Sequence, residues 1–149
     1  MYRRPELRSA LLLVLLSACA TAAAIEPFSS DGCSLFPDRS LITKKDWCDC
    51  CLAHDVAYWR GGTAAERLKA DEELRDCVAR ATRDPALAEL MFVGVRSGGG
   101  PYFFTPYRWG YGWKFGRLYE PLSAEEDRQA AELRAVYLAK NPSLACVAR

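Results

Sequence analysis

Residues 50–58 have the sequence CCLAHDVAY, and residues 71–77 have the sequence DEELRDC; these two stretches decide the fold. The first contains His54, the single histidine of the chain, which excludes any mechanism that needs two histidines. Asp55 follows it directly, but neighbouring side chains on a helix point about 100° apart and do not face each other. The histidine and this aspartate are therefore expected to have different roles.

Both stretches are predicted to lie on helices. The first helix is expected from about Asp46 to Trp59, where two glycines follow and end it. Thr63 and Glu66 then form a capping box, which opens a second helix over residues 64–82. The link between the helices is about three residues, and so short a link predicts an antiparallel pair.

In an antiparallel pair, residues at the same level have residue numbers that add to a constant. If Cys50 and Cys77 form a disulfide, His54 lies ~6 Å along the axis from this bridge, at 1.5 Å per residue. Asp71 lies ~9 Å from the bridge in the same direction. Glu73 is even closer to the level of the histidine, and geometry alone does not choose between the two acids.

The remaining chain predicts two more helices and no strand. Asp84 and Pro85 are a cap and a first-turn proline, which start a helix that continues to about Val95. Ser123 opens another capping box, with a helix to about Lys140. This last helix has apolar residues at helical spacing, which predict core positions: Ala130, Leu133, Val136 and Tyr137. The predicted fold class is mainly α, with additional helices and long loops around the antiparallel pair.

Between these two helices, residues 97–116 form a stretch rich in glycine and aromatic residues. Such a stretch is suited to a membrane interface or an acyl-chain wall, because Trp and Tyr favour the level of the lipid head groups. The alternative is a loop that packs over the helix pair and completes the core. The second interpretation is favoured.

The N-terminus is typical of an export signal. Basic residues are followed by a short apolar run at 10–16 and then by small residues, and the run is too short to span a membrane. Residues 16–19 resemble a bacterial lipobox with Cys19 as the lipidated residue, which is favoured over an ordinary cleavage site after Ala24. The predicted organisation is a leader over residues 1–24 and one domain over 25–149. The protein is expected in the bacterial cell envelope, lipid-anchored on the periplasmic side, or secreted.

Composition agrees with one exported domain. The chain has 149 residues, half of them hydrophobic, which suits a single domain with a real core. Its formal net charge is +1, which argues against a nucleic-acid partner. Six of the seven cysteines follow the leader, and an even number in an exported chain predicts three disulfides.

The pattern C-C-x-x-H-D-x-x-Y at residues 50–58 resembles the active-site helix of the secreted phospholipase A2 family. That family also carries an aspartate six residues before a cysteine, as Asp71 precedes Cys77 here. A cysteine pair that is common in the family is replaced by Ala57 and Ala70, both partners being absent together. The resemblance covers about residues 32–77 and is closest to compact variants, because the hairpin between the helices is missing.

The resemblance implies an enzyme that hydrolyses phospholipid ester bonds at a membrane surface with calcium. His54 corresponds to the general base that activates water, Asp71 to the residue that orients and stabilises its ring, and Tyr58 to a hydrogen-bond donor to Asp71. Asp55 corresponds to the carboxylate that binds Ca²⁺. Backbone carbonyls of the preceding loop are expected to complete the calcium shell: Gly32, Ser34 and Phe36.

The resemblance also implies disulfides Cys33–Cys51 and Cys50–Cys77, which leaves Cys48 and Cys146 as the remaining pair. A zinc cluster of Cys48, Cys50, Cys51 and His54 is the alternative use of these residues. One departure weakens the catalytic interpretation, since the glycine-rich calcium loop of the family is missing. The competing function is therefore a catalytically inactive module that uses the same fold for binding or scaffolding in the envelope.

Overall fold

A computed structural model of the chain describes residues 24–34, 36–37, 39–40 and 46–141. Four helices follow one another: α1 (Cys48–Arg60), α2 (Ala64–Thr82), α3 (Pro85–Gly98) and α4 (Ala124–Lys140). The described residues contain no strand and only an isolated bridge between Arg39 and Asp46. The described part of the chain is therefore all-α, in agreement with the predicted mainly α class.

The predicted capping signals form. The Thr63 hydroxyl accepts from the backbone N–H of Glu66, whose carboxylate accepts from the N–H of Thr63, and Ser123 starts α4 in the same way. Asp84 caps α3, with Pro85 in its first turn. Each cap satisfies backbone N–H groups that a helix start leaves without partners. These signals explain why the observed start of each of these helices agrees with the sequence.

Helix ends differ modestly from the expectation. The α1 helix begins at Cys48 rather than at Asp46, whose side chain instead accepts from the backbone N–H of Cys48. The α3 helix continues past the expected end at Val95 to Gly98. Three added residues matter because they bring Arg96 onto the helix, beside the candidate site.

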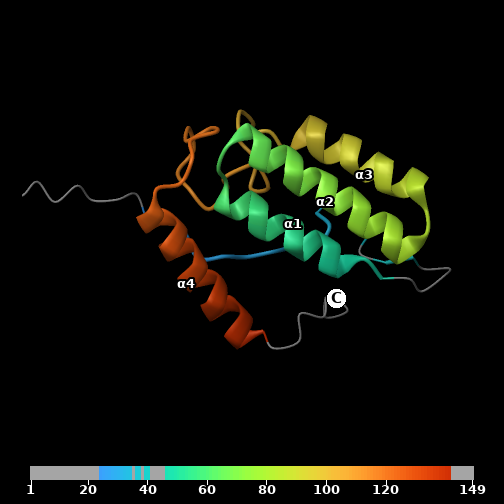
Figure 1. Cartoon of the computed structure of the whole chain (residues 1–149), viewed down its shortest axis with the longest axis horizontal. Coiled ribbons are helices and arrows are strands. Elements are labelled where there is room, and N and C mark those ends of the chain that lie inside the picture. Colours follow the sequence, from blue (N-terminus) through green and yellow to red (C-terminus); the bar gives the residue numbers. More distant parts are fainter. Residues whose placement is uncertain (1–23, 35, 38, 41–45, 142–149) are drawn as a thin grey trace, which may run out of the picture.

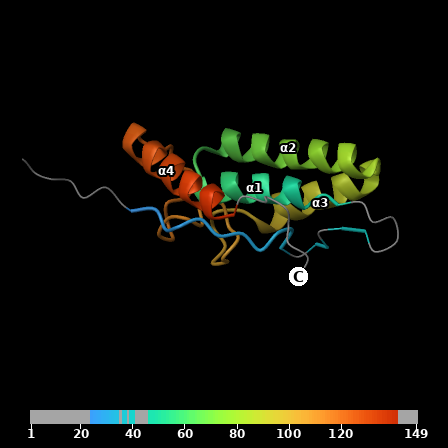
Figure 2. The same cartoon turned by 90° about the horizontal axis from the view of Figure 1, so that it is seen from below.

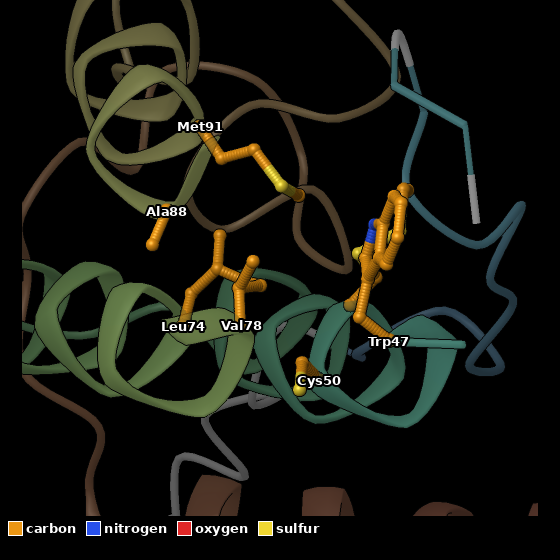
Figure 3. Packing of buried hydrophobic residues seen from close by; sticks show 8 residues of the cluster. Trp47, Cys50, Leu74, Val78, Ala88 and Met91 are labelled. Atoms are coloured by element: carbon orange, nitrogen blue, oxygen red, sulfur yellow. A yellow bond between two sulfur atoms is a disulfide. The ribbon is translucent and has the colours of Figure 1, made fainter. Parts of the chain in front are cut away.

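Helices α1 and α2 form the antiparallel pair, and α3 packs along α2 (Figure 1). Two disulfides hold this region together: Cys33–Cys51 ties the loop before the pair to α1, and Cys50–Cys77 joins α1 to α2. The main core cluster surrounds these bridges (Figure 3). It combines Trp47, which directly precedes α1, with side chains from all three helices, including Leu74, Val78, Ala88 and Met91. The predicted helix pair is thus confirmed together with its two expected bridges.

Cys48 is disulfide-bonded as well. Its expected partner Cys146 lies outside the described residues, as do Cys19 and residues 1–23 of the predicted leader. Disulfides indicate an extracytoplasmic protein. Within the part of the chain that the structure describes, no helix has the length and apolar character that crossing a membrane requires.

The glycine- and aromatic-rich stretch caps the C-terminal end of α1. The last carbonyls of a helix have no partner within the helix and must find donors elsewhere. Here the loop supplies donors to three of them: Gly110 N–H to Tyr58 O (2.6 Å), Gly112 N–H to Trp59 O (3.0 Å) and Trp113 Nε1 to Arg60 O (2.6 Å). Trp109 Nε1 donates to the carbonyl of Gly62, just after the helix, at 2.8 Å. The favoured interpretation, a loop that completes the core, holds for this part.

One part of the same stretch is buried and another part is exposed. Trp109 and Trp113 are 1% and 3% exposed, whereas Tyr102 and Phe104 are 66% and 86% exposed. Figure 2 shows the loop and segment 24–31 (blue) on the side of α1 away from α2. Segment 24–31 is held there by Glu26, whose backbone oxygen accepts from Trp59 Nε1 at 2.7 Å.

One prediction for α4 is wrong. Ala130 is buried, and Leu133 and Tyr137 pack against the same cluster, but Val136 is 49% exposed. The reason is that α4 contacts only α1 among the helices, so its buried face is narrower than the spacing of its apolar residues suggests.

Candidate active site

The antiparallel pair brings His54 of α1 against Asp71 of α2. The imidazole Nε2 lies 2.8 Å from Asp71 Oδ1. The alternative acid, Glu73, is 68% exposed and lies 3.7 Å from the Lys69 ammonium. The Cys50–Cys77 bridge, with its Cα atoms 5.7 Å apart, fixes how the two helices are aligned along their axes. That alignment alone did not distinguish Asp71 from Glu73 as the partner of His54, but the Asp71 side chain points towards the ring.

Asp71 is fully buried, and its carboxylate accepts hydrogen bonds from several charged or polar groups. Tyr58 Oη donates to Oδ1 at 2.8 Å, and the Arg96 guanidinium donates to Oδ2 at 2.7 Å. Burial alone raises the pKa of this carboxyl, but the hydrogen bonds from His54, Arg96 and Tyr58 outweigh it, and the pKa is lowered from its ordinary value. Asp71 is therefore a carboxylate at neutral pH, suited to hold a protonated ring.

Tyr58 is held as a neutral donor. Burial raises the pKa of its hydroxyl, and the negative charge of Asp71 raises it further. Its oxygen also accepts from Arg67 Nε at 3.0 Å. Gly99 packs directly on the ring, where a Cβ atom would lie 2.6 Å from a ring carbon, so that only glycine fits beside the tyrosine. The hydroxyl is thus fixed in place between a cation and an anion.

Sequence reasoning missed Arg67 and Arg96. Arg67 is 4% exposed, lies 3.8 Å from Asp71, and binds the backbone carbonyls of Val95 and Arg96 at 2.8 and 2.9 Å, which ties α2 to the end of α3. Its position four residues before Asp71 on one helix was a usable signal. Arg96 comes from α3, and nothing in the sequence indicated that this helix reaches the pair.

His54 lines a mainly apolar cavity of about 150 Å³, which we call the apolar cavity. Because Nε2 faces Asp71, the neutral tautomer with the proton on Nε2 leaves Nδ1 as the acceptor. The cavity also includes Asp55 and the three loop residues that were expected to bind calcium. Its remaining walls come from α1, α2, α3 and a loop residue, including Tyr58, Leu74, Met91, Val95 and Tyr107.

Asp55 is 9% exposed and lies beside the N-terminal segment. Ser30 Oγ donates to its Oδ2 at 2.5 Å, and the backbone N–H of Gly32 donates to the same hydroxyl at 3.1 Å. The Asp55 carboxylate and the Ser30 hydroxyl offer oxygen atoms, the kind of ligand that calcium prefers. In the turn that follows, the carbonyl of Cys33 accepts from the N–H of Phe36. Cys33 is not one of the expected calcium ligands, so this hydrogen bond does not occupy a carbonyl of the expected set. Calcium binding at these oxygens therefore stays a prediction.

The zinc alternative does not fit. Cys48, Cys50 and Cys51 are disulfide-bonded, and a disulfide offers no thiolate to a metal. In the described ranges, no group of three or more His, Cys, Asp or Glu side chains is placed to hold a metal ion. A calcium site here would consequently need backbone carbonyls beside the single carboxylate of Asp55.

No model of a known protein family matches the chain, and no curated protein or solved structure does so either. The interpretation of the site therefore depends on its own geometry. That geometry brings together His54, Asp71 and Tyr58 in one hydrogen-bonded chain, with Asp55 and the loop residues Gly32, Ser34 and Phe36 around the adjoining cavity.

Proposed function

We propose that the protein hydrolyses a carboxylic ester bond of a phospholipid, in the manner of a calcium-dependent phospholipase A2. One observation carries the proposal: the Tyr58–Asp71–His54 hydrogen-bonded chain borders an apolar cavity that also contains Asp55. A lone histidine on a helix is commonly structural. A histidine with one nitrogen on a buried carboxylate and its ring in a cavity is arranged as a general base.

In the proposed reaction, His54 Nδ1 accepts a proton from a water molecule as the water oxygen attacks the ester carbonyl carbon. Asp71 keeps the ring in the required tautomer and stabilises the imidazolium that forms. The ring then returns the proton to the leaving alkoxide as the ester C–O bond breaks, which yields a fatty acid and a lysolipid. General acid–base catalysis of this kind contributes about 10²- to 10⁴-fold.

Asp55, with carbonyls from Gly32, Ser34 and Phe36, would hold the calcium ion. When bound, calcium supplies Lewis-acid polarisation of substrate oxygens. The Ser30 hydroxyl orients the Asp55 carboxylate from the side of the N-terminal segment. Because Asp55 and His54 are neighbours on α1, their side chains diverge, and the base and the metal ligand serve different atoms of one substrate.

The surroundings of the apolar cavity suit a lipid surface. Met91 and Gly94 of α3 line the cavity, while the adjacent Leu90 and Val93 are 59% and 51% exposed. Exposed apolar side chains beside a cavity are suited to contact with acyl chains at an interface. These exposed side chains support contact between α3 and a phospholipid membrane surface.

The proposal is tested with mature protein and vesicles of mixed-acyl phospholipids, in buffer with calcium or with chelator. Identification of the released fatty acid gives the position of cleavage. Calcium-stimulated release of one fatty acid per lipid is the expected result. If no lipid is hydrolysed, the competing function is favoured, an inactive envelope module whose support is the missing glycine-rich loop.

A further inference from the structure

A second cavity, of about 200 Å³, adjoins the apolar one. Asp55 and Tyr107 line both cavities and form the boundary between them. The other lining residues of the second cavity come from the N-terminal segment and the loop after α3: Ser29, Ser30, Asp31, Pro106 and Tyr111. We call it the polar cavity, since every described lining side chain except that of Pro106 carries a hydroxyl or a carboxylate.

The polar cavity is negatively charged. Asp31 and Asp55 contribute carboxylates, and no lysine, arginine or histidine is among the described residues that line it. Tyr111 responds to this environment, because burial and then the charges of Asp55 and Asp31 raise the pKa of its hydroxyl. An anionic group entering the cavity meets like charge, whereas a cationic group meets opposite charge.

Two aromatic rings complete the cavity. Tyr111 Oη donates to the backbone oxygen of Ser29 at 2.7 Å, which fixes this ring against the N-terminal segment. Tyr107 lies at the boundary with the apolar cavity. Aromatic faces together with a carboxylate are the chemistry that binds substituted ammonium groups. Asp31 also accepts from Ser34 Oγ at 2.9 Å, which orients its carboxylate.

We propose that the polar cavity binds a positively charged lipid head group, choline or ethanolamine, while the acyl chain occupies the apolar cavity. This inference rests on the proposed function for the identity of the lipid, and it adds the class of substrate. Asp31, which is not among the proposed calcium ligands, is the acid that faces the ammonium group with or without calcium, and Tyr107 and Tyr111 supply the rings. Phospholipids with an anionic glycerol head group are the disfavoured substrates.

Binding is measured by calorimetry on the inactive His54→Gln protein, in chelator, with dodecylphosphocholine and dodecyl phosphate below their micelle concentrations. We expect tighter binding of dodecylphosphocholine. Asp31→Asn should weaken it by about twofold to fivefold, the range for an exposed charge pair, and should not weaken binding of dodecyl phosphate. Tyr107→Leu should cost a similar factor through the lost ring contact.

Asp76→Asn is the matched control, because Asp76 is an exposed acid of α2 that lines neither cavity. Equal binding of the two probes, or an Asp31→Asn variant that binds dodecylphosphocholine like the control, overturns the inference. An effect of Asp31→Asn that requires calcium also overturns it and assigns this residue to the metal.

The activity of the wild type separates this inference from the proposed function. Faster hydrolysis of phosphatidylcholine than of phosphatidylglycerol vesicles, with the preference reduced by Asp31→Asn, supports both. Hydrolysis without a head-group preference overturns the inference alone. Asp31-dependent binding of dodecylphosphocholine without any hydrolysis overturns the proposed function alone.

Discussion

Replacement of Asp71 by asparagine tests how the candidate base is positioned. The asparagine oxygen can still accept one hydrogen bond, but the negative charge that faces His54, Tyr58 and Arg96 is lost. The buried guanidinium of Arg67, 3.8 Å away, loses its carboxylate as well. Hydrogen bonds to charged groups contribute about 1.5–3 kcal/mol each, so we expect the free energy of unfolding to fall by about 2–4 kcal/mol.

The effect on catalysis should be larger than the effect on stability. An amide in this position favours the wrong tautomer of the ring and does not stabilise its charged form, which in a buried histidine–aspartate pair costs about 10³- to 10⁴-fold in rate. Calcium affinity should change little, because Asp71 does not line either cavity. Urea unfolding, the initial rate at saturating calcium, and calorimetric titration of calcium measure these three quantities.

Two variants serve as references. Glu73→Gln changes an exposed acid on the same helix, 3.7 Å from Lys69, and should alter stability by less than about 0.5 kcal/mol and the rate hardly at all. Asp55→Asn should weaken calcium binding steeply and lose activity through that loss. If Asp71→Asn weakens calcium as much as Asp55→Asn does, or if Glu73→Gln is the variant that loses the rate, the assigned roles are wrong.

Three further predictions concern the fold. The denatured, non-reduced and non-lipidated mature protein should contain no titratable thiol, and finding three or more thiols with stoichiometric zinc would refute the disulfide assignment. Hydrogen bonds from Arg117, which outweigh burial, lower the pKa of Glu126 to about 2, so its ionised form stabilises the fold above about pH 4.5 and this contribution disappears as the pH falls towards 2. Glu126→Gln should therefore lower the stability to urea by about 1 kcal/mol at pH 7 and leave it unchanged near pH 2. Arg108 is 7% exposed and donates to the carbonyls of Trp109, Gly110 and Trp113, of which, among the described residues, only Gly110 has a second donor, the N–H of Trp113. Arg108→Met should therefore lower the free energy of unfolding by about 2–4 kcal/mol, measured by thermal unfolding as a lower melting temperature.

The sequence predicted the helices well because their signals are local. The start of α2 depends on Thr63 and Glu66, three residues apart, and the capping box forms as expected. By contrast, the donors that complete the end of α1 come from a loop about fifty residues away, and no local pattern indicates which carbonyls they reach. The exposure of Val136 was missed for the same reason, since it depends on how little of α4 the rest of the chain covers.

The candidate site was also predicted only in part. The spacing of residues along two antiparallel helices predicted that His54 lies near the level of both Asp71 and Glu73. The resemblance to the phospholipase A2 motif then indicated Asp71 as its partner. The part contributed by α3 was not predictable, because the contacts of Arg96 and Met91 with the site depend on the packing of a third helix. The polar cavity was also missed, since its walls come from three parts of the chain, around residues 30, 55 and 107, that are far apart in the sequence.

The central claim is that His54 acts as a general base in ester hydrolysis. The most direct test compares wild type and His54→Gln in fatty-acid release from mixed-acyl phospholipid vesicles at saturating calcium, with circular dichroism as the check of folding. Glutamine keeps hydrogen bonding but accepts no proton near pH 7. The account predicts a folded variant whose rate is about 10²- to 10⁴-fold below a calcium-dependent wild-type rate. A folded His54→Gln protein that hydrolyses the lipid as fast as the wild type would contradict it.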